Sequence, residues 1–296
     1  MSTLDQAFIR AYQKQRVIPA PHVAFPAAGA KTLDEAPPAP SIAAPVASET
    51  VDLPSQPEPE ITALASAPMP QPTAVRAALE VEQFDWPEAV EALRLSSADG
   101  FAAWSEQFSR DGSVTLLAVS SARGAGRTTV LLAAARHLSL TRAGAKIVLV
   151  DADFRRPQLA LRLGVAVELG WEDVLSDEQP LAEALVESGA DRLTLLPLRA
   201  EVDDARLAAC GARLCESLRV LQQSFDFICI DAGPLAAAPN AFEGAMLARE
   251  ANIDAALVVR DMRKASGEDN SAIGRRLAER GVRHWDLVEN FVQSGG

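Results

Sequence analysis

One glycine-containing stretch constrains the fold of this chain more than any other, Ser120-Ser121-Ala122-Arg123-Gly124-Ala125-Gly126-Arg127-Thr128-Thr129. It follows an apolar, β-type run at 114–119 and leads into a helical run at 130–140. Gly124 and Gly126 let the backbone curl closely around an anion, and the N–H groups at the new helix N-terminus then point at that anion. The order strand, glycine loop, helix therefore predicts a phosphate-binding loop.

The loop departs from the usual phosphate-binding pattern at two positions. Ser121 stands where the first glycine is expected, and Arg127 stands where a lysine is expected. Lysine is a compact point charge, whereas arginine is a planar fork on a longer stem, so we expect phosphate binding to tolerate the exchange better than catalysis does. Thr128 takes the position of the hydroxyl that meets Mg²⁺ in such loops.

From residue 112 onward, apolar runs alternate with helical patterns. The predicted strands are 114–120, 146–151, 192–197, 226–231, 254–260 and 284–290. The predicted helices are 128–142, 156–163, 171–188, 203–223, 238–249 and 269–281. Near-continuous apolar strands, such as the one at 147–150, are typical of parallel sheets covered on both faces. The predicted fold class is therefore α/β, a mostly parallel sheet with helices on both faces.

Upstream, the composition predicts three segments. Residues 1–16 read as a short amphipathic helix, which is either a weakly ordered terminus or a docking peptide. Thirteen of the 19 prolines fall between residues 17 and 72, which predicts a disordered Pro/Ala-rich linker at 17–73. Residues 74–111 are expected to form a helical lead-in to a nucleotide-binding domain at 112–292. Its predicted helical pieces are 75–83, 87–95 and 98–108.

Charge and cysteine content exclude several classes of protein. The net charge is −12 and neither half of the chain is basic, so there is no electrostatic footprint for nucleic acid. Cys210, Cys215 and Cys229 form no CxxC pair, which predicts three free thiols in a reducing compartment and no metal site on cysteine. The first residues lack a signal-peptide pattern and no apolar run reaches the roughly 18 residues of a membrane span, so we expect a cytoplasmic protein.

Paired carboxylates follow the apolar run at 147–150. Asp151 and Asp153 point the same way if the chain stays extended, because side chains alternate along a strand. Such a pair can hold Mg²⁺ or orient a nucleophile. A helix N-cap with an ion pair to Arg155 or Arg156 explains the same pattern equally well.

A third acidic feature, Asp231, ends the apolar run at 227–230, which is the Walker B pattern for a magnesium-holding aspartate. Any strand can end in aspartate, so the pattern is weak by itself. Ligands of open parallel sheets bind at the carboxyl ends of the strands. The glycine loop, Asp151, Asp153 and Asp231 are therefore expected at one site.

The loop at 121–129, the run Val150-Asp151-Ala152-Asp153-Phe154-Arg155-Arg156-Pro157 and the run Phe225-Asp226-Phe227-Ile228-Cys229-Ile230-Asp231 together resemble the bacterial tyrosine kinases (BY-kinases of the CpsD/CapB type), relatives of the ParA/MinD ATPases. The resemblance covers about residues 112–292. It implies a P-loop fold, ATP and Mg²⁺ as cofactors, and kinase or ATPase activity. It also implies work in capsule or exopolysaccharide production and export, with a membrane polysaccharide co-polymerase of the chain-length determinant type or another export component as partner.

By this resemblance, the ATP phosphates lie in a cradle made by Ala122, Arg123, Gly124, Ala125, Gly126, Arg127, Thr128 and Thr129. The implied Mg²⁺ ligands are Thr128, Asp151 and Asp231. The implied catalytic residues are Arg127, Asp151 and Asp153, with Asp151 as the principal catalytic aspartate. Asn290 matches the family's asparagine on the adenine side, and it reads equally well as a turn residue at the end of a strand.

Three departures from the family keep alternatives open. The sequence ends at 291–296 without the usual tyrosine cluster, only Glu91 and Arg94 remain of a motif used in ring assembly, and Ala122 replaces the signature lysine of ParA. The chain is thus an active kinase or ATPase, a catalytically weak adaptor that reads nucleotide, or a ParA/MinD-like positioning ATPase. We expect no nucleic-acid partner, recruitment to the inner face of the membrane by a partner, and either a monomer or a homo-oligomer.

Overall fold

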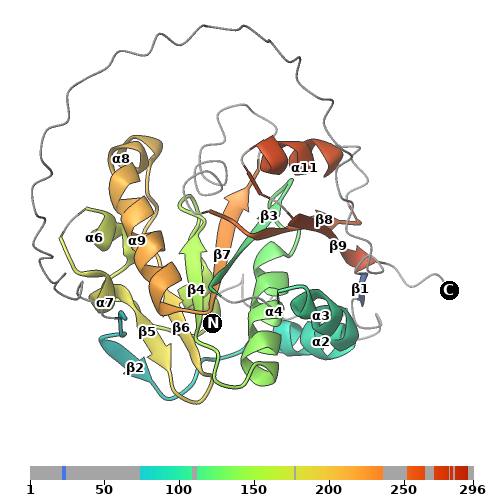
Figure 1. The fold of residues 1–296 in the computed structure, drawn as a ribbon, viewed down its shortest axis with the longest axis horizontal. Helices are drawn as coiled ribbons and strands as arrows, with labels where there is room; N and C mark the ends of the chain where they lie inside the picture. The colour runs from blue at the N-terminus through green and yellow to red at the C-terminus, as the bar shows by residue number, and fades with distance from the viewer. Residues whose placement is uncertain are drawn as a thin grey trace, which may run out of the picture. The chain divides into compact units, whose positions relative to one another are not determined.

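The computed structural model describes residues 22–24, 74–108, 112–176, 178–235, 252–263, 270–279, 281–282 and 284–292. Within these ranges the strands form one nine-stranded sheet, in the order β1-β9-β8-β3-β7-β4-β6-β5-β2 (Figure 1). The strands are β1 (His22–Ala24), β2 (Leu79–Val81), β3 (Val114–Ser120), β4 (Ile147–Ala152), β5 (Val186–Ser188), β6 (Leu193–Leu196), β7 (Phe227–Pro234), β8 (Ala255–Asp261) and β9 (His284–Val292).

The central part of the sheet is parallel. Strands β9, β8, β3, β7, β4 and β6 all run in one direction. The exceptions lie toward the edges, where β5 is antiparallel to β6 and β1 is antiparallel to β9. This arrangement confirms the predicted α/β class with a mostly parallel sheet.

Helices cover both faces of the sheet (Figure 1). The described helices are α2 (Glu88–Ser96), α3 (Ala98–Glu106), α4 (Arg127–Thr141), α5 (Leu159–Arg162), α6 (Trp171–Leu175), α7 (Leu181–Ala184), α8 (Asp204–Ala209), α9 (Gly211–Ser224) and α11 (Asn270–Glu279). Side chains of α2, α3 and α4 share one apolar cluster with the sheet. Side chains of α6, α9 and α11 belong to a second cluster on the opposite face.

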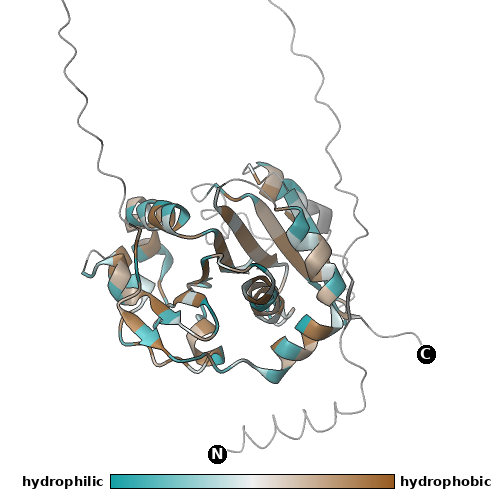
Figure 2. Cartoon of the chain, turned by 60° about the horizontal axis from the view of Figure 1, so that its bottom comes forward, coloured by the Kyte–Doolittle hydropathy of each residue, from teal (hydrophilic) through white to brown (hydrophobic). Residues whose placement is uncertain are grey.

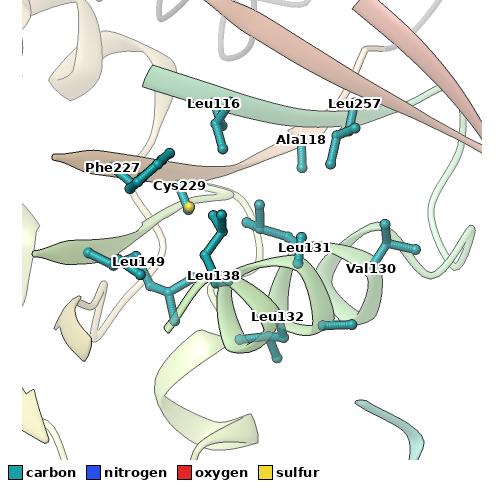
Figure 3. Packing of buried hydrophobic residues seen from close by; sticks show 14 of the residues in the cluster. Leu116, Ala118, Val130, Leu131, Leu132, Leu138, Leu149, Phe227, Cys229 and Leu257 are labelled. Atoms are coloured by element: carbon teal, nitrogen blue, oxygen red, sulfur yellow. The ribbon is translucent and has the colours of Figure 1, made fainter. Parts of the chain in front are cut away.

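The alternation of side chains along β3 shows why both faces are apolar. Leu116 and Ala118 face α4, where Leu131 is among the residues packed against them (Figure 3), whereas Leu117 and Val119 belong to the opposite cluster. A strand that is buried on both faces must be apolar at successive positions, because neighbouring residues point to opposite faces. Figure 2 shows the result as hydrophobic strands at the centre and mixed hydropathy on the outer helices.

Helix α4 is buried on almost all sides. Its outer surface is covered by the lead-in helices α2 and α3, whose Phe101 and Trp104 are buried in the same cluster. This extra layer explains why α4 is apolar around its circumference, from Val130 to Leu138. Trp86 and Trp104 both pack against this cluster, and Trp86 also stacks on Arg136 at 4.9 Å.

Asp191 ties the lead-in to the sheet. Its Oδ2 accepts from the backbone N–H of Phe84 at 2.7 Å and from Ser188 Oγ at 2.7 Å. Its Oδ1 accepts from Trp86 Nε1 at 2.9 Å and from Arg136 Nη1 at 2.6 Å. Although burial acts to raise the pKa of Asp191, these hydrogen bonds and the Arg136 charge outweigh it, so the pKa lies below its usual value.

Most predicted strands and helices are confirmed within two or three residues, and three predictions are wrong. The helix predicted at 75–83 is replaced by an extended segment that includes β2, because this segment pairs with β5. The helix predicted at 171–188 breaks into α6, α7 and β5, with Pro180 just before α7. The helix predicted at 203–223 is divided at Cys210 into α8 and α9.

Other predictions fall outside the described residues. They are the amphipathic helix within 1–16, the disordered linker at 17–73 apart from β1, and the helix at 238–249. The three cysteines are free thiols, as predicted, and burial raises the pKa of Cys229 to about 12. No helix in the described part of the chain combines the length and apolarity that crossing a bilayer requires.

Candidate functional site

The glycine loop joins the end of β3 to the start of α4, as the sequence predicts. Gly124 and Gly126 have φ values of 78° and 84°, which lie in the left-handed region where glycine carries little steric cost. Gly126 is the residue immediately before α4, so the first free N–H groups of that helix belong to the loop. The loop therefore has the backbone shape and the helix N-terminus of an anion cradle.

Strand register brings the predicted acidic residues to this loop. On adjacent strands Asp151 of β4 lies opposite Asp231 of β7, and β7 pairs directly with β3. Both aspartates are almost completely buried, with relative exposures of 0% and 1%. The structure thus places the loop and the carboxylates at the same edge of the sheet, where parallel sheets bind ligands.

Arg127 forms ion pairs with two of these carboxylates. Its Nε donates to Asp231 Oδ1 at 2.5 Å and its Nη2 donates to Asp153 Oδ2 at 2.9 Å. Burial acts to lower the pKa of Arg127, but the charges and hydrogen bonds of Asp231 and Asp153 outweigh it and hold the pKa above its usual value. The arginine is therefore a permanent cation inside the acidic cluster.

The Thr128 hydroxyl lies against Asp231 of β7. Its Oγ1 donates to Asp231 Oδ2 at 2.7 Å. Asp231 therefore has one oxygen bound by Arg127 and the other by Thr128. Hydroxyl and Walker B carboxylate are in direct contact, the pairing that jointly surrounds Mg²⁺ in nucleoside triphosphatases.

Asp151 caps the segment that begins α5. Its Oδ2 accepts from the N–H groups of Gln158 and Leu159, each at 2.9 Å, and its Oδ1 accepts from the N–H of Asp153 at 3.3 Å. Burial and the charge of Asp231 raise the pKa of Asp151 to about 7, against the effect of these three hydrogen bonds. A carboxyl group with this pKa can both accept and return a proton near neutral pH.

The alternative interpretation of the acidic motif included an ion pair to Arg155 or Arg156, and the structure has a different arginine at Asp153. Arg155 pairs with Asp204, and the arginine that reaches Asp153 is Arg127. Arg155 and Arg156 follow Asp153 in the chain, beyond the end of β4. Arg127, the first residue of α4, reaches the Asp153 carboxylate instead. Asp153 has spare capacity, since its buried Oδ1 has no hydrogen-bond partner among the described residues.

Asn290 contacts the glycine loop directly. Its Nδ2 donates to the carbonyl of Ala125 at 2.9 Å. A Cβ atom on Gly126 would lie 2.0 Å from the same Nδ2, so the contact depends on glycine at that position. Arg263 also reaches the loop, because its Nη2 donates to the carbonyl of Gly124 at 3.3 Å while its guanidinium covers the ring of Phe291 at 3.5 Å.

The remaining loop residues have simpler environments. Ala122 accepts a hydrogen bond from Ser120 Oγ through its carbonyl at 2.9 Å. Arg123 is exposed and Thr129 is half-buried in the first turn of α4. Sequence reasoning missed the contact between Arg127 and Asp153, because the two residues lie 26 positions apart and no local pattern joins them.

The donor atoms fit Mg²⁺ and a nucleotide phosphate. Thr128, Asp231 and Asp153 supply the hard oxygen atoms that Mg²⁺ prefers, and Asp153 Oδ1 is available. No set of three or more acidic, histidine or cysteine side chains in the described ranges is arranged as a complete metal cage. That arrangement suits Mg²⁺, which is usually held by one or two carboxylates together with water and substrate phosphates.

The chain has a ParA/MinD-like P-loop ATPase fold, and the resemblance stated from sequence is confirmed at the level of the fold. No protein-family model matches the sequence. The septum site-determining protein MinD of Synechocystis sp. is 35% identical over 119 residues, which is 39% of this chain and 43% of that protein. The match therefore spans less than half the length of this curated relative.

Two solved kinase domains share the fold. The kinase domain of VpsO superposes with a TM-score of 0.55 at 24% identity, over 66% of this chain and 94% of that one. The kinase domain of the Escherichia coli tyrosine kinase ETK gives a TM-score of 0.55 at 22% identity, over 71% of this chain and 76% of that one. At these identities the likeness establishes the fold.

Proposed function

We propose that this chain binds ATP at residues 121–129 and is an ATP-dependent enzyme of the BY-kinase type, acting as an ATPase or protein kinase in capsule or exopolysaccharide production. One observation carries the proposal. The Thr128 hydroxyl, in the first turn of the helix that follows a loop with two left-handed glycines, is hydrogen-bonded to Asp231 at 2.7 Å. Phosphate cradle, hydroxyl and carboxylate are among the parts that P-loop enzymes use for phosphoryl transfer.

Each residue has a defined task in this proposal. The loop N–H groups and the α4 N-terminus bind the phosphate oxygens. Thr128 and Asp231 would hold Mg²⁺, which supplies charge neutralisation at the phosphates when bound. Asp151, with a pKa near 7, takes the proton of the attacking hydroxyl or water. In the nucleotide-free protein Asp153 pairs with Arg127, and Asn290 and Arg263 hold the loop from the ends of β9 and β8.

The partner and location follow from the same proposal. We infer a cytoplasmic protein that is recruited to the inner face of the membrane by a polysaccharide co-polymerase or another export component. A net charge of −12 favours a protein partner over nucleic acid. Recruitment is tested by co-purification with such a co-polymerase at two salt concentrations.

A second function, a nucleotide-dependent adaptor without turnover, is favoured by the position of Arg127. Both carboxylates that Arg127 contacts, Asp153 and Asp231, are groups that catalysis would need. An adaptor needs only bound and free states that a partner can distinguish.

Calorimetry with ATP, ADP and GTP, followed by a turnover assay on the same sample, separates these functions. The enzyme proposal expects ATP binding and turnover that falls at least tenfold in Asp151→Asn. An Asp204→Asn variant, which changes an exposed aspartate paired with Arg155, is the matched control and should retain turnover. Turnover that is equal in Asp151→Asn and the unmodified chain would overturn the enzyme proposal.

Binding without turnover, with no gain on Arg127→Lys, would instead support the adaptor. Salt-sensitive binding to DNA would support a ParA/MinD-like positioning ATPase.

A further inference from the structure

The acidic cluster at the end of β7 already contains a cation, the guanidinium of Arg127. Its two contacts, at 2.5 Å to Asp231 and 2.9 Å to Asp153, are made by a side chain that is only 9% exposed. Two neighbouring arginines are paired elsewhere, Arg155 with Asp204 and Arg263 with Asp261. Arg127 therefore balances the negative charge of Asp153 and Asp231 in the described part of the chain.

The position of this guanidinium disfavours a divalent metal at Asp231. Mg²⁺ binds oxygen at about 2.0–2.1 Å and requires near-octahedral space around it. Asp231 Oδ1 has Arg127 Nε at 2.5 Å, and Asp231 Oδ2 has Thr128 Oγ1 at 2.7 Å. A metal on Oδ1 would stand beside the guanidinium, and two desolvated like charges at that separation repel strongly.

We propose that Arg127 is a resident cation that competes with Mg²⁺ for Asp231 and Asp153, so that metal enters only when nucleotide phosphates draw the guanidinium away. The proposal rests on the nucleotide site proposed above. Arg127 is the first residue of α4, next to the loop, so phosphate oxygens are its natural second partner. We call this arrangement a lock, because Arg127 keeps metal out of the site until nucleotide binds.

The lock predicts a coupling between two ligands. Mg²⁺ alone gains little, because it must first break two buried ion pairs. Nucleotide and Mg²⁺ together exchange those ion pairs for contacts between Arg127 and phosphate and between the metal and Asp231. Each ligand should therefore raise the affinity for the other by the same factor, as linkage requires. Replacing Arg127 by a neutral side chain should abolish most of this coupling.

The test measures Mn²⁺ binding to the full, nucleotide-free chain, using the electron paramagnetic resonance signal of free Mn²⁺ as the readout and Mn²⁺ as the probe for the magnesium position. We expect at least tenfold tighter Mn²⁺ binding in Arg127→Met than in the unmodified chain. Arg127→Lys should give a smaller gain, because a point charge cannot hold two carboxylates as a fork does. Circular dichroism checks that each variant is folded, and Arg127→Lys decides the matter if Arg127→Met is not.

Arg199→Met is the matched control. Arg199 also joins two carboxylates, Asp173 at 3.1 Å and Glu172 at 3.5 Å, away from the loop. It should leave Mn²⁺ affinity unchanged. An equal gain in Arg199→Met would mean that any freed acid attracts the metal, and it would overturn the proposal.

Two further outcomes distinguish this proposal from the one on which it rests. If the unmodified chain binds Mn²⁺ without nucleotide as tightly as the folded Arg127 variants do, the lock is wrong while the ATP site stands. If ADP and ATP do not bind at any Mg²⁺ concentration, the ATP site is wrong. In that case a gain of Mn²⁺ binding in Arg127→Met still establishes the competition at the carboxylates, and no gain overturns it.

Discussion

Two arginines of α4 each lie against a buried aspartate, and the two aspartates differ in how completely their hydrogen-bonding capacity is satisfied. In the second half of the helix, Arg136 contacts Asp191, whose two oxygens each accept two hydrogen bonds. At the start of the helix, Arg127 contacts Asp153, whose Oδ1 has no partner in the described part of the chain. One cluster is saturated and the other is not.

The difference separates a structural role from a functional one on physical grounds. A saturated buried network stabilises one arrangement, because every alternative loses hydrogen bonds. An unsaturated buried oxygen costs free energy in the resting protein, and a ligand that bonds to this oxygen removes the cost. Asp191 therefore stabilises the packing of the lead-in on the sheet, whereas Asp153 has an oxygen that is available to a ligand.

The largest expected effect is on folding stability, at the fully hydrogen-bonded Asp191. Asp191→Ala leaves the Phe84 N–H and the Trp86 indole without their acceptor, while Arg136 loses one of its ion pairs and keeps the one with Glu91. The variant should lower the free energy of unfolding by about 3–5 kcal/mol. Asp153→Ala leaves Arg127 its bond to Asp231 and should cost only about 1 kcal/mol. Urea denaturation of both variants measures the contrast, and equal losses would refute the division of roles.

The next effect is a pH dependence of opposite sign at two aspartates. Burial and Asp231 raise the pKa of Asp151 to about 7, so the stability present below the unfolded pKa is lost as pH rises through about 7. Asp191 has a lowered pKa, so its contribution is present above the unfolded pKa and is lost as pH falls through the folded value.

Unfolding titrations of the metal-free and nucleotide-free protein measure both effects. Between pH 5 and pH 7, Asp151→Asn should lose less stability than the unmodified chain, by on the order of 2 kcal/mol. Asp191→Asn should instead reduce the loss of stability as the pH falls into the acid range. Parallel curves for Asp151→Asn and the unmodified chain would mean that the Asp151 carboxyl has an ordinary pKa in the folded protein.

A smaller effect is expected for Gly126→Ala. Its φ of 84° is unfavourable for alanine by about 1–2 kcal/mol, and the new Cβ would meet Asn290 Nδ2 at 2.0 Å. Stability should fall and ADP affinity should drop at least tenfold. Gly144→Ala is the control, since its φ of 82° carries the same backbone cost with nothing within 4 Å of the Cβ. A similar loss of ADP affinity in Gly144→Ala would disprove a specific role for the loop contact.

The smallest effect is expected for Asn290→Ala, which removes the hydrogen bond to the Ala125 carbonyl. We expect a loss of about 1 kcal/mol in stability and a few-fold weaker ADP binding. Gln222→Ala removes an amide hydrogen bond to Thr115 Oγ1 at 3.0 Å, outside the loop, and should cost stability alone. Unchanged ADP affinity in Asn290→Ala would show that the contact only stabilises the fold.

The sequence predicted the centre of the fold well because strong local signals coincide there. The strand at 114–120 agrees with β3, and the helix predicted from 128 begins one residue earlier, since a long apolar run, two glycines and a helical pattern follow one another. The segment 75–83 was predicted wrongly because its local pattern is compatible with a helix, while its pairing with β5 depends on residues far along the chain.

The site was predictable in its members and not in its contacts. Strand-end aspartates and the loop follow from topology, because carboxyl ends of parallel strands lie together. The partners of Arg127 lie 26 and 104 residues away, and no local pattern specifies which carboxylate a flexible side chain will reach. The saturation of Asp191 was invisible for the same reason, since its donors include a backbone N–H 107 residues away.

The pairing of β2 with β5 has a consequence for synthesis on the ribosome. The edge strand emerges long before its partner, because the same 107-residue separation that joins Phe84 to Asp191 also divides Leu79 from Val186. Contacts of such high sequence separation form slowly, and a growing chain exposes its early segments meanwhile. The pairing of β2 with β5 can therefore form only after β3, α4 and β4, which lie between the two strands in the chain, have been translated.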